Sequence, residues 1–108
     1  MDLAILGTGL MPFGRHDGVT PIEMGVTAAH AALEDAGLGW SDVQLAFAGS
    51  LEVLQPDTMI RHMGLTGIPF TTLYNGCATG GNLLLSAANA ITAGAGDIAI
   101  AIGMDKHP

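Results

Sequence analysis

Hydrophobic residues recur along this chain with two spacings, which predict alternating strands and helices. Three short apolar runs, bounded by glycine or polar residues, are expected to be strands: 3–6, 45–48 and 98–102. A fourth strand is expected at 71–74, which is rich in β-forming residues. Between them lie longer segments in which hydrophobic residues recur every three or four positions, as on one face of a helix. Because strands and helices alternate, we expect an α/β fold built on a parallel sheet with crossover helices.

The first long helix is predicted to begin at Pro21 and to end just before Gly37. Thr20 can cap this helix, Pro21 suits its first position, and Glu23 completes a capping box. Apolar residues at helical spacing form one face: Ile22, Val26, Ala29, Leu33 and Ala36. The opposite face is polar: Glu23, His30 and Glu34. A helix with one polar face belongs on the outside of a fold.

The second long helix, predicted at 79–93, has no continuous polar face. Its polar residues are small or uncharged: Asn82, Ser86, Asn89 and Thr92. A helix that is apolar nearly all round must be covered on both sides, and one sheet covers only one side. We therefore infer a helix buried between two layers, at least one of which these 108 residues do not encode. A shorter helix is predicted at 57–63.

Charge and composition exclude several classes of protein. Hydrophobic residues make up 49% of the chain and charged residues 12%, so it is too apolar to be disordered. The net charge is -7 and the only basic residues are Arg15, Arg61 and Lys106, which argues against nucleic acid and anionic membrane surfaces. Neither a signal-peptide pattern nor an apolar run of about 20 residues is present. One cysteine cannot form an internal disulfide, so we expect a soluble, cytoplasmic protein.

The run NGCATGG at 75–81 lies where a predicted strand meets the second long helix. Glycines on both sides of Cys77 permit a sharp turn, as a nucleophile elbow requires. At the start of a helix, unpaired N–H groups and the helix dipole favour the thiolate, which can attack a thioester and form an acyl-cysteine. From the residues alone the alternative stays open, that Cys77 is a free cysteine packed as a small hydrophobe in the core.

A wider pattern resembles the thiolase superfamily. NGCATGG is followed by an alanine-rich helix, GAGD at 94–97, an apolar strand and GMDK at 103–106. The opening is similar too, with an apolar run, GTG at 7–9, PFGR at 12–15 and AALEDAGL at 31–38. The resemblance covers nearly the whole chain, and it is closest to the thiolases related to sterol-carrier and lipid-transfer proteins.

This resemblance implies a layered αβαβα fold, of which residues 1–108 form a partial N-terminal domain with a mostly parallel sheet. It implies an acyl-CoA acyltransferase in which Cys77 accepts the acyl group and the Cys77 N–H contributes to an oxyanion hole. The substrate would be a coenzyme A thioester, with no permanently bound cofactor and no residue yet assigned to coenzyme A binding. The protein would be a homodimer formed near the Cys77 strand, or would work with a partner subunit.

The same resemblance limits what the chain can do alone. The family's activating histidine and acid/base residues would lie beyond Pro108, so we expect residues 1–108 alone to be inactive. Three alternatives stay open. The protein could be a ketoacyl-synthase-like condensing enzyme, a thiolase-like aldolase subunit, or a non-catalytic thiolase-like subunit or truncated product that binds acyl groups or partners.

Other candidate features point less clearly to a function. GTG at 7–9 follows a predicted strand, but Pro12 stands where a dinucleotide-binding motif has its third glycine. The histidines show no metal-ligand spacing, so no metal is expected: His16, His30, His62 and His107. Tyr74 could line an acyl pocket, although packing between layers is favoured. Asp105 and Lys106 could face the site, although solvation or an exposed ion pair is favoured.

Overall fold

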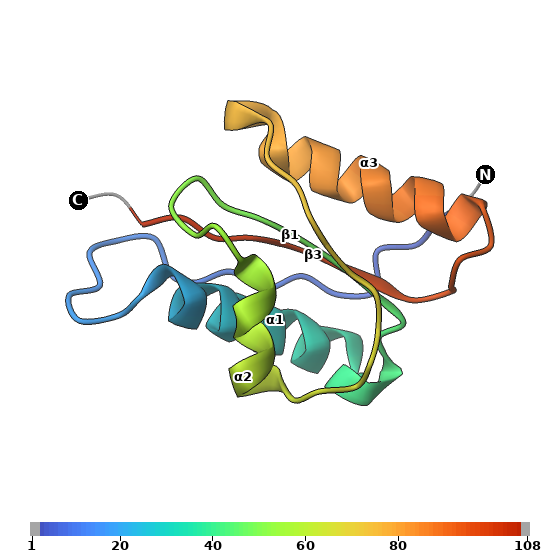
Figure 1. The fold of residues 1–108 in the computed structure, drawn as a ribbon. Coiled ribbons are helices and arrows are strands. Elements are labelled where there is room, and N and C mark those ends of the chain that lie inside the picture. The colour runs from blue at the N-terminus through green and yellow to red at the C-terminus, as the bar shows by residue number, and fades with distance from the viewer. Residues whose placement is uncertain (1–2, 107–108) are drawn as a thin grey trace.

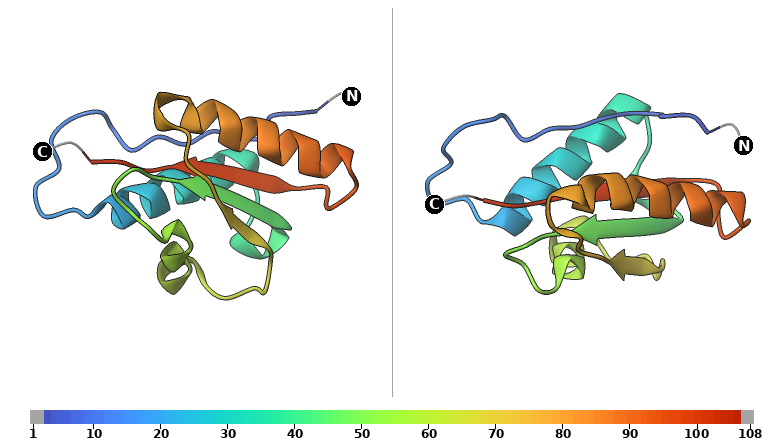
Figure 2. Two further views of the ribbon diagram at one scale, coloured as in Figure 1. Left: turned by 45° about the horizontal axis from the view of Figure 1, so that its top comes forward. Right: turned by 90° about the horizontal axis from the view of Figure 1, so that it is seen from above.

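The computed structural model describes residues 3–106, which form a parallel sheet with helices on both faces (Figure 1, Figure 2). The helices are α1 (Pro21–Ala36), α2 (Ile60–Met63) and α3 (Thr79–Thr92). The strands are β1 (Leu45–Gly49), β2 (Phe70–Thr72) and β3 (Ala99–Gly103), in the spatial order β2-β1-β3. Single 3-10 turns lie at Trp40–Asp42, Pro56–Met59 and Gly76–Ala78. Because β2 and β3 both pair with β1 in parallel, the predicted sheet type is confirmed.

β1 lies at the centre of the sheet and is buried along its whole length. Its successive side chains point to opposite faces, as strand geometry requires. Leu45 and Phe47 pack with Leu83 of α3. Ala48 packs with Ala29 of α1 on the other face. A strand covered on both faces needs apolar residues at every position, which is why its sequence is continuously hydrophobic.

α1 begins and ends where the sequence predicts. The Glu23 N–H donates to Thr20 Oγ1 at 3.2 Å, and the Thr20 N–H donates to Glu23 Oε2 at 3.1 Å. Gly37 ends the helix in the left-handed conformation, with a φ of 71°. Glu23, His30 and Glu34 are exposed. The capping box, the C-terminal glycine and the outward polar face are therefore all confirmed.

Three other predicted elements are present with ends that differ by one or two residues: 71–74, 79–93 and 98–102. Of the helix predicted at 57–63, only Ile60–Met63 is α-helical, and a 3-10 turn at Pro56–Met59 precedes it. β2 ends at Thr72, two residues before the predicted end, and its last pair in the register is Ala48 with Thr72. The Leu73 N–H donates to Ala48 O at 3.1 Å, and β1 ends one residue after Ala48. The residues after Leu73 therefore leave the sheet and lead into the turn that carries Cys77.

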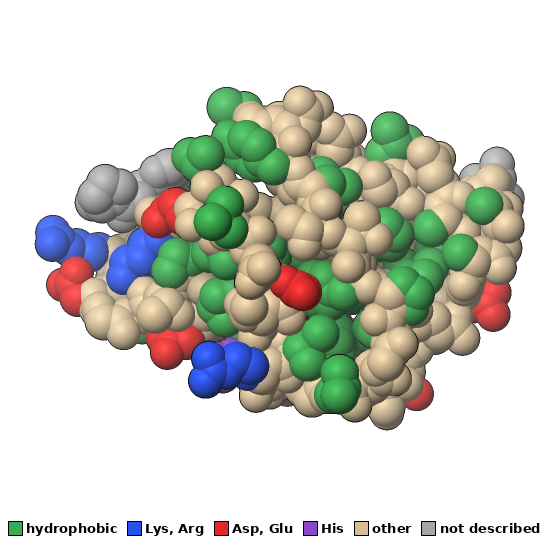
Figure 3. Space-filling model, viewed as in Figure 1, with side chains coloured by type: hydrophobic (Ala, Val, Ile, Leu, Met, Phe, Trp, Pro, Cys, Tyr) green, Lys and Arg blue, Asp and Glu red, His purple; other side chains and the backbone are tan. Residues whose placement is uncertain are grey.

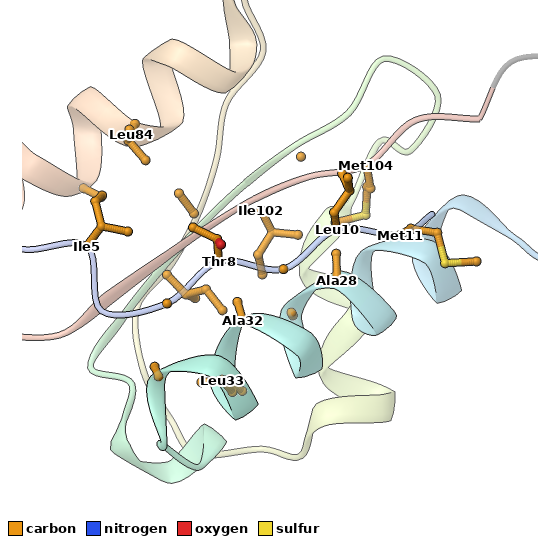
Figure 4. Close-up of a pocket in the computed structure, with 18 of the residues that line it drawn as sticks. Ile5, Thr8, Leu10, Met11, Ala28, Ala32, Leu33, Leu84, Ile102 and Met104 are labelled. Atoms are coloured by element: carbon orange, nitrogen blue, oxygen red, sulfur yellow. The ribbon is translucent and has the colours of Figure 1, made fainter. Parts of the chain in front are cut away.

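The strand predicted at 3–6 is wrong, because these residues are extended but belong to no sheet. A strand is held by hydrogen bonds to a neighbouring strand, and within residues 3–106 the segment 3–6 pairs with none. Together with α1, α3 and β3 it lines a hollow of about 1390 Å³, shown in Figure 4. Apolar side chains from all four parts face this hollow: Ile5, Leu10, Leu33, Leu84 and Ile102.

The N-terminal segment lies very close to α1. A Cβ atom at Gly9 would clash with the backbone of Ala28 and Ala32, and one at Gly7 would lie 2.6 Å from Ala32 O. Side chains at these two positions would force the segment away from the helix. The glycines of GTG therefore have a packing role against α1.

α3 is covered by the sheet on one side only. Leu83 is 2% exposed and Ala87 is 8% exposed, whereas Leu84 and Leu85 are 55% and 57% exposed. In Figure 3, hydrophobic side chains reach the surface along the top of the molecule, where α3 lies in Figure 1. The prediction that the sheet of this chain covers only one side of the helix is confirmed. The second layer that would cover the other side stays a prediction. No helix among the described residues, α3 included, is long and apolar enough to cross a bilayer.

Candidate active site

Cys77 lies in the 3-10 turn Gly76–Ala78, which joins the segment after β2 to the start of α3 (Figure 1). Its side chain is exposed, so Cys77 does not pack in the core that residues 3–106 form. The turn follows the carboxyl end of β2, and ligands of parallel sheets gather at the carboxyl ends of the strands. The thiol is therefore open to a reagent from solvent at the edge where this kind of fold binds ligands.

Two local features fix the backbone before Cys77. Gly76 has a φ of 56°, a left-handed conformation that residues with a side chain adopt only at a cost. The Thr79 hydroxyl accepts a hydrogen bond from the Asn75 N–H and donates one to Gly76 O, both at 2.8 Å. One side chain thus ties the residues before Cys77 to the first turn of α3.

The carboxyl end of β1 lies directly against this turn. A Cβ atom on Gly49 would lie 2.5 Å from Leu73 O and 2.5 Å from Thr79 Cγ2. Contacts this short are not tolerated by a real side chain, so the close approach depends on glycine at position 49. The turn that carries Cys77 therefore rests on the central strand of the sheet.

The electrostatic surroundings of Cys77 come from the backbone. α3 begins two residues after Cys77, and its N-cap residue, Ala78, provides no side-chain cap. The N–H groups of the first helical turn and the helix dipole favour negative charge at this end. Among residues 3–106, no histidine or carboxylate hydrogen-bonds the thiol, and no group of three or more His, Cys, Asp or Glu could hold a metal ion.

Asp105 and Lys106 are neither paired with each other nor free in solvent, so the favoured interpretation of them is wrong. Asp105 Oδ1 accepts hydrogen bonds from the Ser50 hydroxyl at 2.9 Å and from the N–H groups of Leu51 and Glu52 at 2.8 and 3.3 Å. Lys106 Nζ donates to two backbone carbonyl oxygens of the loop 16–19, both at 2.6 Å. Both side chains therefore hold loops at the carboxyl end of the sheet.

Tyr74 is 53% exposed within the described residues, so packing between layers stays a prediction that needs the layer outside them. It lines a hollow of about 260 Å³ at the carboxyl ends of β1 and β2, with Leu51, Leu54 and Thr72. The prediction that Tyr74 contributes to an acyl pocket stays a prediction.

The described histidines lie apart from one another. His16 Nε2 lies 2.6 Å from Pro12 O in the N-terminal segment. His30 is exposed on α1 and His62 is exposed on α2. His107 lies outside the described residues. These positions give no reason to assign any of the three described histidines to the Cys77 site.

Comparison with known proteins identifies the family. Residues 3–107 match the family described as thiolase, N-terminal domain. The chain belongs to the thiolase family. It is 33% identical to an acetyl-CoA acetyltransferase of Methanothermobacter thermautotrophicus, over 97% of this chain and 29% of that protein. It is 28% identical to sterol carrier protein 2 of Gallus gallus, over 94% of this chain and 20% of that protein.

Solved structures agree with the thiolase family at the level of the fold. A 3-oxoacyl-[acyl-carrier-protein] synthase III from Aquifex aeolicus superposes with a TM-score of 0.74 at 21% identity, over 81% of this chain and 30% of that one. OleA of Xanthomonas campestris, a C143S form with bound lauric acid and lauroyl-CoA, gives 0.70 at 21% identity, over 81% of this chain and 28% of that one. The predicted thiolase-like α/β fold is confirmed, and the chain spans at most about a third of these thiolase relatives.

Sequence reasoning did not single out Thr79 or Gly49. The role of Thr79 could have been predicted from the sequence. A threonine at the start of a helix often hydrogen-bonds through its side chain to the backbone three or four residues earlier, and Asn75 lies four residues before it. The bond between Ser50 and Asp105 joins residues far apart in the chain, so no local pattern could have predicted it.

Proposed function

We propose that the protein carrying this chain is a thiolase-type acyl-CoA acyltransferase in which Cys77 accepts the acyl group. One observation carries the proposal: Cys77 is exposed on a sharp turn between the end of a parallel strand and the uncapped start of α3. The thiolase family match supports it, as does the similarity to an acetyl-CoA acetyltransferase.

In the proposed reaction, the Cys77 thiolate attacks the carbonyl carbon of a coenzyme A thioester. A carbon–sulfur bond forms to Cys77, and the bond to the coenzyme A sulfur breaks, so coenzyme A leaves as its thiolate. The N–H groups at the start of α3 favour the negative charge that develops there. A carbon nucleophile then attacks the acyl carbonyl carbon, a carbon–carbon bond forms, the bond to the Cys77 sulfur breaks, and the Cys77 thiolate is regenerated. The same steps in reverse cleave a 3-ketoacyl thioester.

The proposal also assigns a role to residues 1–108 within a longer protein. They would form a partial N-terminal domain, and the acid/base residues would come from outside them. The protein would form a homodimer near β2, the strand that precedes Cys77 and lies at an edge of the described sheet. Residues 1–108 alone would not complete a catalytic cycle.

The direct test is mass spectrometry of the full-length protein after exposure to acetyl-CoA. We expect an acetyl group on the Cys77 peptide of the wild-type protein and none in Cys77→Ser, which keeps the size of the side chain but supplies a far weaker nucleophile. Circular dichroism of both proteins checks that the substitution leaves the fold unchanged.

The same experiment tests the nucleophile assignment and the non-catalytic alternative. Turnover of an acyl thioester with an unlabelled Cys77 would overturn the nucleophile assignment. A protein that binds acetyl-CoA but neither acetylates Cys77 nor turns over would instead be a non-catalytic thiolase-like subunit.

A further inference from the structure

We propose that Thr79 is a positioning residue that holds the Cys77 thiol in the orientation needed for acyl transfer. This inference rests on the proposed role of Cys77 as the nucleophile. Thr79 would not touch the acyl group. It would act through the backbone on either side of the cysteine.

The hydrogen bonds of Thr79 lead to this conclusion. Its hydroxyl bonds to the Asn75 N–H and to Gly76 O, so it joins the two residues before Cys77 to the helix that follows. Within residues 3–106 the Cys77 side chain itself makes no hydrogen bond. No hydrogen bond to the thiol fixes its position, and the Thr79 hydroxyl bonds to the backbone of the two residues before it.

The methyl group of Thr79 makes a second contact with the sheet. Thr79 Cγ2 lies so close to Gly49 that a Cβ atom there would be 2.5 Å away. Thr79 is thus held against the central strand by its methyl group while its hydroxyl holds the turn. Serine keeps only the hydroxyl and valine keeps only the shape, so the two functions can be tested separately.

Removing the hydroxyl should loosen the turn. Gly76 has no side chain to restrict its backbone, so without the Thr79 bonds the residues before Cys77 gain access to other conformations. An acyl transfer step needs the attacking sulfur close to the carbonyl carbon and correctly oriented, and small displacements slow such steps strongly. We expect Thr79→Val to lower the rate of Cys77 acylation about tenfold or more and to leave the KM for acyl-CoA within about twofold.

The experiment compares Thr79→Val and Thr79→Ser in the full-length protein, with Thr92→Val as a control. Thr92 lies at the far end of the same helix and donates to Ala88 O at 2.8 Å, so its substitution also removes a hydroxyl hydrogen bond from α3. Acylation by acetyl-CoA and alkylation by iodoacetamide are measured at Cys77 by mass spectrometry. We expect slow acylation only in Thr79→Val, with alkylation within about twofold of wild type in all four proteins, because the thiol stays exposed.

Amide hydrogen exchange at Asn75 tests the inference without any acyl chemistry. This amide should be protected in the wild type and in Thr79→Ser, and should exchange at least about tenfold faster in Thr79→Val. If the valine variant does not fold, Thr79→Ala against Thr79→Ser isolates the hydroxyl instead. Wild-type acylation rates in the variant that lacks the hydroxyl would overturn the positioning role. A wild-type protein that takes up no acyl group would overturn the proposed function, and Asn75 exchange would still decide whether Thr79 orders the turn.

Discussion

At the scale of single residues, Asp105 has more hydrogen-bond partners than any pattern in the sequence suggests. One of its carboxylate oxygens accepts three hydrogen bonds from the loop that follows β1. Ser50 is 8% exposed, and its hydroxyl donates to Asp105 and also accepts from two N–H groups further along this loop, at 3.1 and 2.9 Å. Because Leu51 and Leu54 of this loop line the hollow beside Tyr74, Asp105 helps to fix the wall of that hollow.

Asp105→Ala should therefore lower the free energy of unfolding by about 2 kcal/mol, because it leaves the buried Ser50 hydroxyl and two N–H groups without their acceptor. Asp105→Asn keeps an oxygen acceptor and should cost less. Urea unfolding of the full-length protein measures both values. The control is Asp17→Ala, which removes an exposed carboxylate whose partner is Arg15 and should change stability by less than about 0.5 kcal/mol. Equal losses at positions 17 and 105 would contradict the structural role of Asp105.

At the scale of elements, helices could be predicted more accurately than strands. The ends of α1 depend on local signals, namely the capping box of Thr20 and Glu23 and the left-handed Gly37. A strand depends on a neighbour that may be far away in the sequence. This dependence explains why the apolar run at 3–6, which pairs with no described strand, is not itself a strand.

The capping box can be tested by substitution. Thr20→Ala removes the side-chain acceptor of the Glu23 N–H and should destabilise the protein by about 1 kcal/mol. Thr27→Ala is the matched control, because Thr27 is exposed in the middle of the same helix and alanine is the better helix former. We expect the control to be neutral or slightly stabilising in urea unfolding. A Thr27 variant that loses as much stability as the Thr20 variant would contradict the capping assignment.

At the scale of the whole molecule, apolar surface is left uncovered in two connected places. The outer side of α3 is exposed, and the hollow between the N-terminal segment, α1 and β3 is largely lined by apolar side chains.

One part of the candidate site could be predicted from the sequence, and another part could not. Cys77 and its turn were predictable because they lie in one short run of sequence. The support from Gly49 was not predictable, because it depends on how strands and helix pack in three dimensions.

We therefore expect residues 1–108, produced alone, to self-associate through the exposed side of α3. Size-exclusion chromatography with light scattering should show species larger than a monomer. Leu85→Lys should reduce the association, because it places a charge on the exposed apolar surface. His30→Lys adds a charge on the exposed polar face of α1 instead and should reduce association much less. A monodisperse, cooperatively unfolding wild-type monomer would contradict the inference that α3 needs a second layer.

The central position of β1 has a consequence for the order in which the growing chain can fold. Both neighbours of β1 are synthesised after it: Ala46 pairs with Phe70, and Leu45 pairs with Ala99. At about 5–20 residues per second, the ribosome needs several seconds to pass from β1 to β3. In the later part of that time the chain already contains Cys77 and α3, but α3 lacks part of the sheet that it contacts. Cys77 is thus synthesised before α3 can complete its contacts with β3.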